Sequence, residues 1–158
     1  MLQEEDVTFL VIDDDEVSVM AIKRAIRSLK LLNDVMVARD GEEALDLLRT
    51  KESGLCAKPY IILLDINMPR MNGLEFLAEV RDDPCLRTSV IFMVTTSEAP
   101  SDIAAAYDHL VAGYIVKENA MRSLRDALEM LGSYVRIVRL PIRPEISSFM
   151  EERPVLAG

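Results

Sequence analysis

Short apolar runs alternate along the chain with longer stretches whose apolar residues recur at helical spacing. Runs of a few apolar residues without polar alternation are typical of parallel strands, which helices cover on both faces. The sequence therefore predicts a set of buried strands. They are Phe9–Ile12, Val35–Val37, Tyr60–Leu64, Val90–Val94 and Tyr114–Val116.

The stretches between these runs predict amphipathic helices. After the first strand, Val19, Ile22 and Ile26 lie on one helical face, while the other face carries lysine and arginine. Further helices are predicted at Asp40–Leu48, Gly73–Asp82, Pro100–His109 and from Ala120 onward. This alternation predicts an α/β domain of the (βα)5 type, because right-handed crossovers place successive parallel strands in one doubly wound sheet. We expect the strand order 2-1-3-4-5, with a functional crevice at the carboxyl ends of the strands.

The last predicted helix is long and carries two apolar stripes. From Ala120 to Leu140 it would measure about 30 Å at 1.5 Å per residue. One stripe comprises Met121, Leu124, Leu128, Leu131, Val135 and Val138, and its neighbour comprises Ala127, Met130, Tyr134 and Ile137. The second stripe either folds back on its own domain or forms an exposed face for a partner.

The length of 158 residues fits one domain with short appendages. We expect an N-terminal extension over residues 1–6, the domain over 7–131, and a helix extension with a proline-containing tail over 132–158. The formal net charge of −9 excludes autonomous binding to nucleic acid. The start lacks a secretory signal, and no apolar run approaches the ~20 residues that span a bilayer, so we expect a cytoplasmic protein away from membranes.

Acidic residues follow two of the predicted strands. Asp13, Asp14 and Asp15 come directly after the first strand, and Asp65 comes after the third. Taken alone, the first three could simply cap the following helix. If the strand ends bring the carboxylates together, their repulsion, about 4 kcal/mol per pair at about 4 Å and an effective dielectric near 20, demands a cation. Oxygen ligands without His or Cys favour Mg²⁺ over Zn²⁺.

Two further polar residues lie at the ends of the fourth and fifth strands. Thr95 follows Val94, and Lys117 follows Val116. Alone, the first would be a helix-capping hydroxyl and the second a solvated charge. Beside the acids, a hydroxyl and an ammonium at the same edge of the sheet indicate a pocket for a phosphoryl group.

The quoted residues fall within four segments, which are the pair Asp13-Asp14, Leu63–Gly73, Val94–Thr96 and Gly113–Lys117. Together they resemble the response-regulator receiver domains of two-component signalling, in the chemotaxis-regulator-like superfamily, over residues 7–131. The resemblance implies a flavodoxin-like fold. It also implies a single-domain response regulator of a phosphorelay, which signals by conformational change and protein contact and is not an enzyme beyond self-phosphorylation and slow autodephosphorylation.

The resemblance implies a role for each acid. Asp65 would be the phosphoacceptor and would attack a phosphohistidine on a sensor histidine kinase. Asp14, one oxygen of Asp65 and the backbone carbonyl of Asn67 would bind Mg²⁺ directly, while Asp13 would act through water.

The resemblance also places Thr95 and Lys117 against the phosphoryl group. Phosphorylation would draw in Thr95, and Tyr114 would enter the space that this frees. Without the resemblance, Tyr114 could be an edge-strand aromatic with its hydroxyl in solvent. The chain departs from the family pattern at Glu118, where receivers usually carry proline. We expect a trans peptide bond there, because a non-proline cis bond costs about 3 kcal/mol.

A narrower resemblance is to stand-alone regulators that pair with phytochrome-type histidine kinases. It is carried by Thr95–Asp108 and Tyr134–Pro141. It implies a homodimer formed through the last strand and the extended last helix, with Met130, Tyr134 and Ile137 in the interface.

Two other functions remain open from the sequence. A haloacid-dehalogenase-like phosphatase also uses a strand-end aspartate with Mg²⁺, but it needs an acidic residue two positions later, where this chain has Asn67. A pseudo-receiver would bind partners without being phosphorylated, and Glu118 is the residue that favours it.

Overall fold

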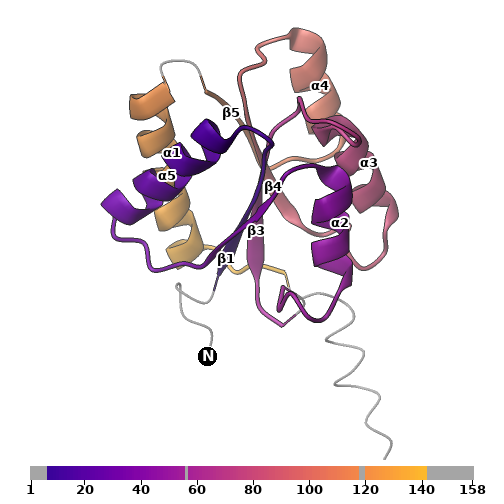
Figure 1. Ribbon diagram of the computed structural model, residues 1–158, viewed down its shortest axis with the longest axis horizontal. Coiled ribbons are helices and arrows are strands. Elements are labelled where there is room, and N and C mark those ends of the chain that lie inside the picture. The colour runs from indigo at the N-terminus through magenta and orange to yellow at the C-terminus, as the bar shows by residue number, and fades with distance from the viewer. Residues whose placement is uncertain (1–6, 56, 118–119, 142–158) are drawn as a thin grey trace, which may run out of the picture.

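The computed structural model describes residues 7–55, 57–117 and 120–141. Within these residues the strands form one parallel sheet in the order β2-β1-β3-β4-β5 (Figure 1). The predicted fold class and strand order are confirmed. The strands are β1 (Thr8–Ile12), β2 (Val35–Ala38), β3 (Tyr60–Leu64), β4 (Val90–Thr95) and β5 (Gly113–Val116).

The helices cover both faces of the sheet. Helices α1 and α5 lie on one face, and α2, α3 and α4 lie on the other (Figure 1). Their bounds are α1 Glu16–Ser28, α2 Gly41–Arg49, α3 Gly73–Asp82, α4 Pro100–Asp108 and α5 Ala120–Ile137. Among these helices, none is long and apolar enough to cross a membrane.

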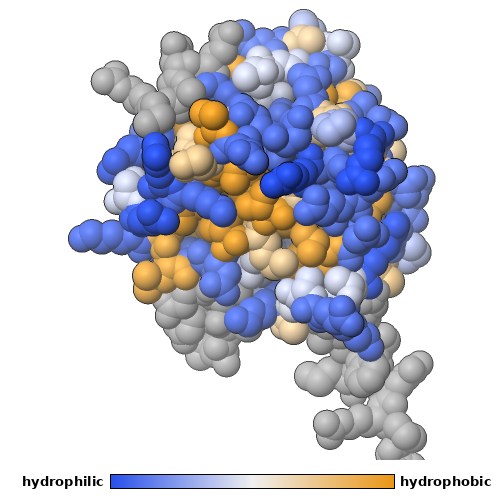
Figure 2. All heavy atoms as spheres, in the orientation of Figure 1, coloured by the Kyte–Doolittle hydropathy of each residue, from blue (hydrophilic) through white to orange (hydrophobic). Residues whose placement is uncertain are grey.

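The central strands β1 and β3 are buried along their whole length, and β4 is buried after Val90, because their side chains alternate between two cores. In β1, Leu10 and Ile12 join the core under α2, α3 and α4, whereas Phe9 and Val11 join the core under α1 and α5. The edge strand β2 is only half-buried. On the face of the molecule that Figure 2 shows, apolar side chains gather in the middle and polar side chains surround them.

Helix α5 follows the prediction in part. Leu124, Leu128 and Leu131 form a buried stripe against the sheet, as expected. The helix ends at Ile137, earlier than the predicted Leu140, and Val138 is therefore partly exposed instead of continuing the buried stripe. Met121 belongs to the helix, but its side chain is not among those that the structure describes.

The second stripe of α5 divides into two parts. Tyr134 folds back on its own domain, where its ring packs edge-on against Phe92 with the ring centroids 5.5 Å apart. Met130 and Ile137 remain 44% and 80% exposed. The stripe therefore folds back on the domain at Tyr134 and is exposed at Met130 and Ile137, while the predicted binding of a partner by the exposed residues stays a prediction.

Candidate functional site

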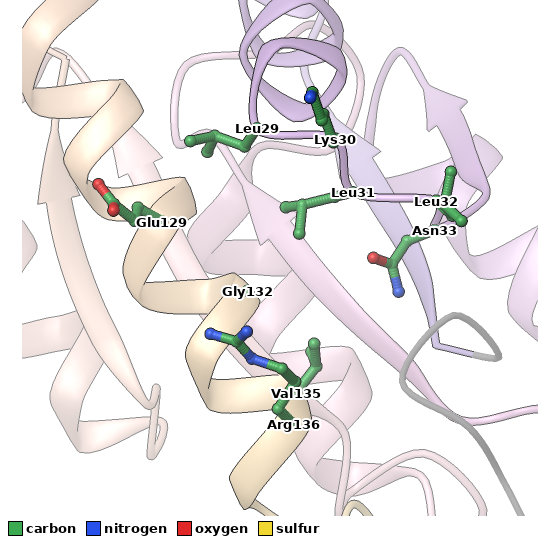
Figure 3. A pocket seen from close by; sticks show the side chains of 9 residues that line it. All are labelled: Leu29, Lys30, Leu31, Leu32, Asn33, Glu129, Gly132, Val135 and Arg136. Carbon is green, nitrogen blue, oxygen red and sulfur yellow. The ribbon is translucent and has the colours of Figure 1, made fainter.

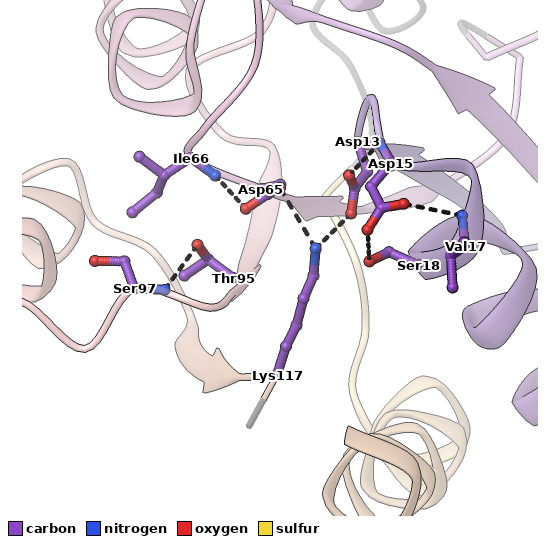
Figure 4. A network of polar contacts seen from close by, with 9 residues as sticks. All are labelled: Asp13, Asp15, Val17, Ser18, Asp65, Ile66, Thr95, Ser97 and Lys117. Carbon is purple, nitrogen blue, oxygen red and sulfur yellow. Dashed lines mark hydrogen bonds and ion pairs between the residues drawn. The ribbon is translucent and has the colours of Figure 1, made fainter. Parts of the chain in front are cut away.

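The carboxyl ends of β1, β3, β4 and β5 bring the predicted residues together (Figure 4). Asp13 and Asp65 directly follow the paired strand ends Ile12 and Leu64. The parallel hydrogen bonding continues past the strands, since the Asp65 amide donates to the Ile12 carbonyl at 2.9 Å and the Lys117 amide donates to the Thr95 carbonyl at 2.8 Å. The backbone of the sheet thus fixes where these side chains start.

Lys117 links the two acidic strand ends. Its side chain is only 12% exposed, and its Nζ lies 2.7 Å from Oδ2 of Asp13 and 3.4 Å from Oδ2 of Asp65. Figure 4 shows the ammonium between the two carboxylates, with Thr95 on the neighbouring strand end. The ammonium partly neutralises a site in which two aspartates are buried.

The acidic cluster has the composition of a site for a hard cation. Asp13, Asp14 and Asp65 each offer a carboxylate oxygen, and these oxygens lie within 4.8 Å of one another. One lysine cannot balance three carboxylates, so the cluster keeps excess negative charge. Asp14 is exposed and gives the cluster access to solvent. Such oxygen donors fit Mg²⁺, which binds one or two carboxylates and retains waters.

Burial sets the electrostatics of Asp13. Loss of solvent raises the pKa of its carboxyl above the ordinary value, and the hydrogen bond from Lys117 opposes that rise. A buried carboxylate whose negative form is disfavoured gains most from a nearby cation. The pKa of Asp13 is therefore consistent with a site that is completed by a positive ion.

The run of three aspartates divides its roles. Asp15 is the N-cap of α1, because its side chain accepts from the Val17 amide at 3.0 Å. The hydrogen bond from the Ser18 hydroxyl lowers the pKa of Asp15. The capping alternative is thus correct for Asp15, whereas Asp13 and Asp14 join the acidic cluster.

Asp65 is oriented by its own loop. Its Oδ1 accepts from the Ile66 amide at 2.8 Å, which leaves Oδ2 on the side of Lys117. The loop is closed by the Gly73 amide, which donates to the Ile66 carbonyl at 2.8 Å. A Cβ at Gly73 would lie 2.2 Å from the Asp65 carbonyl oxygen, so only glycine permits this approach.

Thr95 and Tyr114 are joined through Ser97. Thr95 is fully buried, and its Oγ1 accepts from the Ser97 amide at 3.3 Å. The Tyr114 hydroxyl donates to the Ser97 carbonyl at 2.8 Å, and burial raises the pKa of Tyr114. The hydroxyl is therefore bound to the β4–α4 loop instead of projecting into solvent. The Ser97 hydroxyl in turn donates to Asp102 at 2.5 Å.

Some contacts near the site were not predicted from the sequence. Asp102 and Arg70 bind residues in neighbouring loops, and Asp40, located between β2 and α2, is buried like Asp13 and Asp65. An isolated charge next to a glycine or proline loop is the one sequence signal for such contacts. That signal is too common to be specific.

Two predicted features are not placed by these contacts. Asn67 is exposed in the loop after β3, and the contact of its carbonyl with a metal ion is still a prediction. Glu118 and its peptide bond with Lys117 lie outside the described residues. The expected trans bond is therefore still a prediction.

The surface is hollowed beside the acidic cluster and also at the other end of the sheet. The first hollow, about 450 Å³, is lined by Asp13, Asp14, Lys23 and Arg39 among others. The second, about 300 Å³, lies between the α1–β2 connection and α5 (Figure 3). Only the first of these two adjoins carboxylates of the acidic cluster, and its lining includes Asp13 and Asp14 but not Asp65.

The fold and the site define a doubly wound α/β domain with an acidic pocket at the carboxyl edge of its sheet. The chain belongs to the response regulator receiver domain family, whose model matches residues 9–129. The family predicted from the sequence is confirmed.

Known relatives agree with this assignment. A protein of Methanothrix harundinacea, described as the probable methanogenesis regulatory protein FilR2, is 30% identical over 131 residues, which are 83% of this chain and 84% of that protein. The crystal structure of the phosphorylated cyanobacterial phytochrome response regulator RcpA is 29% identical, with a TM-score of 0.75 over 85% of this chain and 97% of that one. The Mn²⁺-bound form of the response regulator Rcp1, a Synechocystis protein, is 25% identical, with a TM-score of 0.72 over 85% and 98% of the two chains.

Proposed function

We propose that this chain is a response-regulator receiver that accepts a phosphoryl group on Asp65 from a sensor histidine kinase. The observation that carries the proposal is the position of Lys117. Its ammonium lies between Asp13 and Asp65 at the carboxyl edge of the sheet, where β4 ends in Thr95. Phosphoryl transfer to an aspartate uses a carboxylate nucleophile, an acidic cluster that binds a cation, a hydroxyl and an ammonium.

In the proposed step, an Asp65 carboxylate oxygen forms a bond to phosphorus as the bond from phosphorus to the kinase imidazole nitrogen breaks. The electron pair of the broken bond stays on the imidazole, which takes up a proton, and Asp65 becomes an acyl phosphate. The ionised carboxylate has no proton to lose, so no general base is needed.

Mg²⁺ fits the acidic cluster, and Asp14, Asp65 and the Asn67 carbonyl are the ligands that we propose, with Asp13 acting through water. When bound, the ion would neutralise charge on the phosphoryl oxygens. Lys117 would hold an equatorial oxygen from the other side. The similar protein Rcp1 has a Mn²⁺-bound form, which supports a divalent ion for this chain.

The same contacts suggest how the signal would leave the site. A phosphoryl group on Asp65 gives the Thr95 hydroxyl a new acceptor. The Ser97 amide and carbonyl connect Thr95 to the Tyr114 hydroxyl, so movement of the β4–α4 loop would change the position of Tyr114. The output would be a protein contact that responds to this movement around Tyr114 on β5.

We further propose a phytochrome-type kinase as the partner, which the likeness to RcpA and Rcp1 supports. The receiver domain would span residues 7–131, with the rest of α5 and the tail as an extension. A homodimer through β5 and α5 would use Met130 and Ile137, with Tyr134 at its margin, since that ring already packs on Phe92.

Incubation of the full chain with acetyl phosphate and Mg²⁺ tests the proposal. The chain should gain the mass of one phosphoryl group, and Asp65→Asn should abolish the gain while Asp46→Asn, an exposed acid on α2, should not. Sustained hydrolysis of phosphomonoesters would instead indicate a phosphatase. No mass gain and no hydrolysis would indicate a pseudo-receiver.

A further inference from the structure

A third buried carboxylate, besides those of Asp13 and Asp65, lies at the start of α2, outside the acidic cluster. The side chain of Asp40 is 3% exposed. Its Oδ1 accepts from the Glu43 amide at 2.9 Å and so caps α2. Its Oδ2 accepts from the Arg70 guanidinium, with Nε at 2.7 Å and a terminal nitrogen at 2.5 Å. One carboxylate therefore binds a helix end and a distant loop at the same time.

Arg70 lies in the middle of the loop that connects Asp65 to α3. Its φ is 61°, in the left-handed region that a non-glycine residue adopts only when its surroundings hold it there. Next to it, the Met71 carbonyl accepts from the Gly41 amide at 3.0 Å. A Cβ at Gly41 would lie 2.6 Å from Met71 Cγ, so the loop packs closely on the start of α2.

The loop held in this way also contains Asn67, three residues before Arg70. Hydrogen bonds hold its ends, where the Gly73 amide donates to the Ile66 carbonyl and the Ile66 amide donates to the Asp65 carboxylate. Between those ends, Met68 and Met71 pack against the core, and the loop is tied to α2 by the backbone bond from Gly41 and by Arg70, which pairs with Asp40 and, at 3.4 Å, with Glu42. The position of the Asn67 carbonyl thus depends on contacts made by Arg70 and Met71.

We propose that Arg70 is a positioning residue for the metal site, and that its ion pair with Asp40 holds the Asp65–Gly73 loop in the form that binds a divalent cation. This inference rests on the proposed function, which assigns the Asn67 carbonyl to the metal. Residues that orient a metal ligand affect metal affinity although they do not touch the ion.

The sign of the effect separates positioning from simple electrostatics. Arg70 carries a positive charge, so its removal would strengthen the binding of a divalent cation if charge alone mattered. Loss of a positioning contact weakens binding instead, because the loop must then be ordered when the ion binds. The two explanations therefore predict changes in opposite directions.

The chain offers a matched control for the loss of charge. Arg49 lies at the other end of α2 and pairs at 3.2 Å with Asp83, the C-cap residue of α3. This ion pair also joins α2 to another segment of the domain. Arg49→Gln and Arg70→Gln remove the same charge and the ion pairs that it makes. Only Arg70→Gln releases the loop that contains Asn67.

Titration calorimetry with Mg²⁺ on the full chain tests the inference. We expect Arg70→Gln to weaken Mg²⁺ binding by about tenfold and Arg49→Gln to leave it unchanged. Arg70→Lys, which keeps the charge but lacks the two-nitrogen contact, should also bind more weakly. It provides the measurement if the glutamine variant does not fold. Hydrogen exchange of the Gly41 and Gly73 amides should be faster in the Arg70 variants.

Equal or tighter Mg²⁺ binding by the Arg70 variants would overturn the positioning role and leave the proposed function intact. Equal weakening by Arg49→Gln would also overturn it, because the effect would then not be specific to the loop. If the wild-type chain itself binds no Mg²⁺, the proposed function fails, and the role of Arg70 fails with it.

Discussion

At the scale of single residues, Gly73 shows how closely the loop backbone approaches the phosphoacceptor candidate. In Gly73→Ala, the added Cβ would lie 2.2 Å from the Asp65 carbonyl oxygen, which is backbone and cannot rotate away. We expect the free energy of unfolding to fall by about 3 kcal/mol, as when a well-packed site is overfilled. Urea unfolding measures the change.

Gly132→Ala is the matched control for this substitution. Its Cβ would meet only the end of the Leu31 side chain, at 3.1 Å, and alanine favours the helix in which it lies. We expect a change within about 0.5 kcal/mol of the wild type. Equal losses for the two variants would show that the close contact at Asp65 has no special cost.

Asp40 should give the fold a measurable dependence on pH. Burial alone would raise the pKa of its carboxyl, but hydrogen bonds from the Glu43 amide and Arg70 hold the pKa below the ordinary 3.8. The ionised form therefore adds stability above pH 3.8, and this contribution is lost as the pH falls through the lower pKa of the folded state.

We expect Asp40→Asn to be less stable than the wild type at pH 7, with a gap that narrows as the pH falls below 3.8. Urea unfolding of both proteins over a pH series measures the gap. Asp46→Asn, an exposed acid on the same helix, should stay close to the wild type throughout. A gap for Asp40→Asn that does not change with pH would contradict the role of its charge.

The residues of the proposed site could be predicted because strand ends fix their positions. Asp13, Asp65 and Lys117 each directly follow a strand whose place in the sheet is set by its apolar run. The contacts of Arg70 and Asp102 could not be predicted, since they depend on loop conformations. No periodic pattern indicates that Arg70 adopts a positive φ, or that Asp102 accepts from Ser97.

At the scale of elements, α5 carries an apolar surface that its own domain does not cover. Met130 and Ile137 are exposed on the helix whose other side packs on the sheet. Exposed apolar side chains at a helical spacing of seven favour a symmetric contact between two copies. Replacing both with glutamate should shift a dimer to a monomer in light scattering.

Leu32→Glu provides the control for the dimer prediction. Leu32 is 76% exposed but lies in the α1–β2 connection, so the change adds charge to an apolar surface outside α5. We expect the dimer to persist in this variant. An unchanged mass after the change at Met130 and Ile137 would exclude the proposed interface.

The ends of the elements were predicted less well than their existence. The start of α3 at Gly73 follows from Asn72, which forms a capping box with Glu75. The end of α5 was placed too late, at Leu140 directly before Pro141, whereas the helix already ends at Ile137. A proline marks where a helix cannot continue, but not the last residue that is helical.

At the scale of the whole molecule, the site joins strand ends from across the sheet. Asp13 and Lys117 are bonded at 2.7 Å although they lie 104 residues apart in the sequence, and Asp65 comes from the strand between β1 and β4. A ligand bound there contacts several strands at once, so its binding free energy adds to the stability of the fold. The acidic cluster, by contrast, opposes folding while its charges are not balanced.

Mg²⁺ should therefore raise the unfolding temperature, and beryllofluoride, a mimic of a phosphoryl group, should raise it further. A ligand at one hundred times its dissociation constant adds about 2.7 kcal/mol to the free energy of unfolding. Scanning calorimetry of the full chain with neither, with Mg²⁺ and with both measures each step. Asp65→Asn should remove the step due to beryllofluoride, because the mimic needs the carboxylate oxygen, whereas Asp46→Asn should keep both steps. An unfolding temperature that neither addition changes would mean that the carboxylates meet at this edge without forming a binding site.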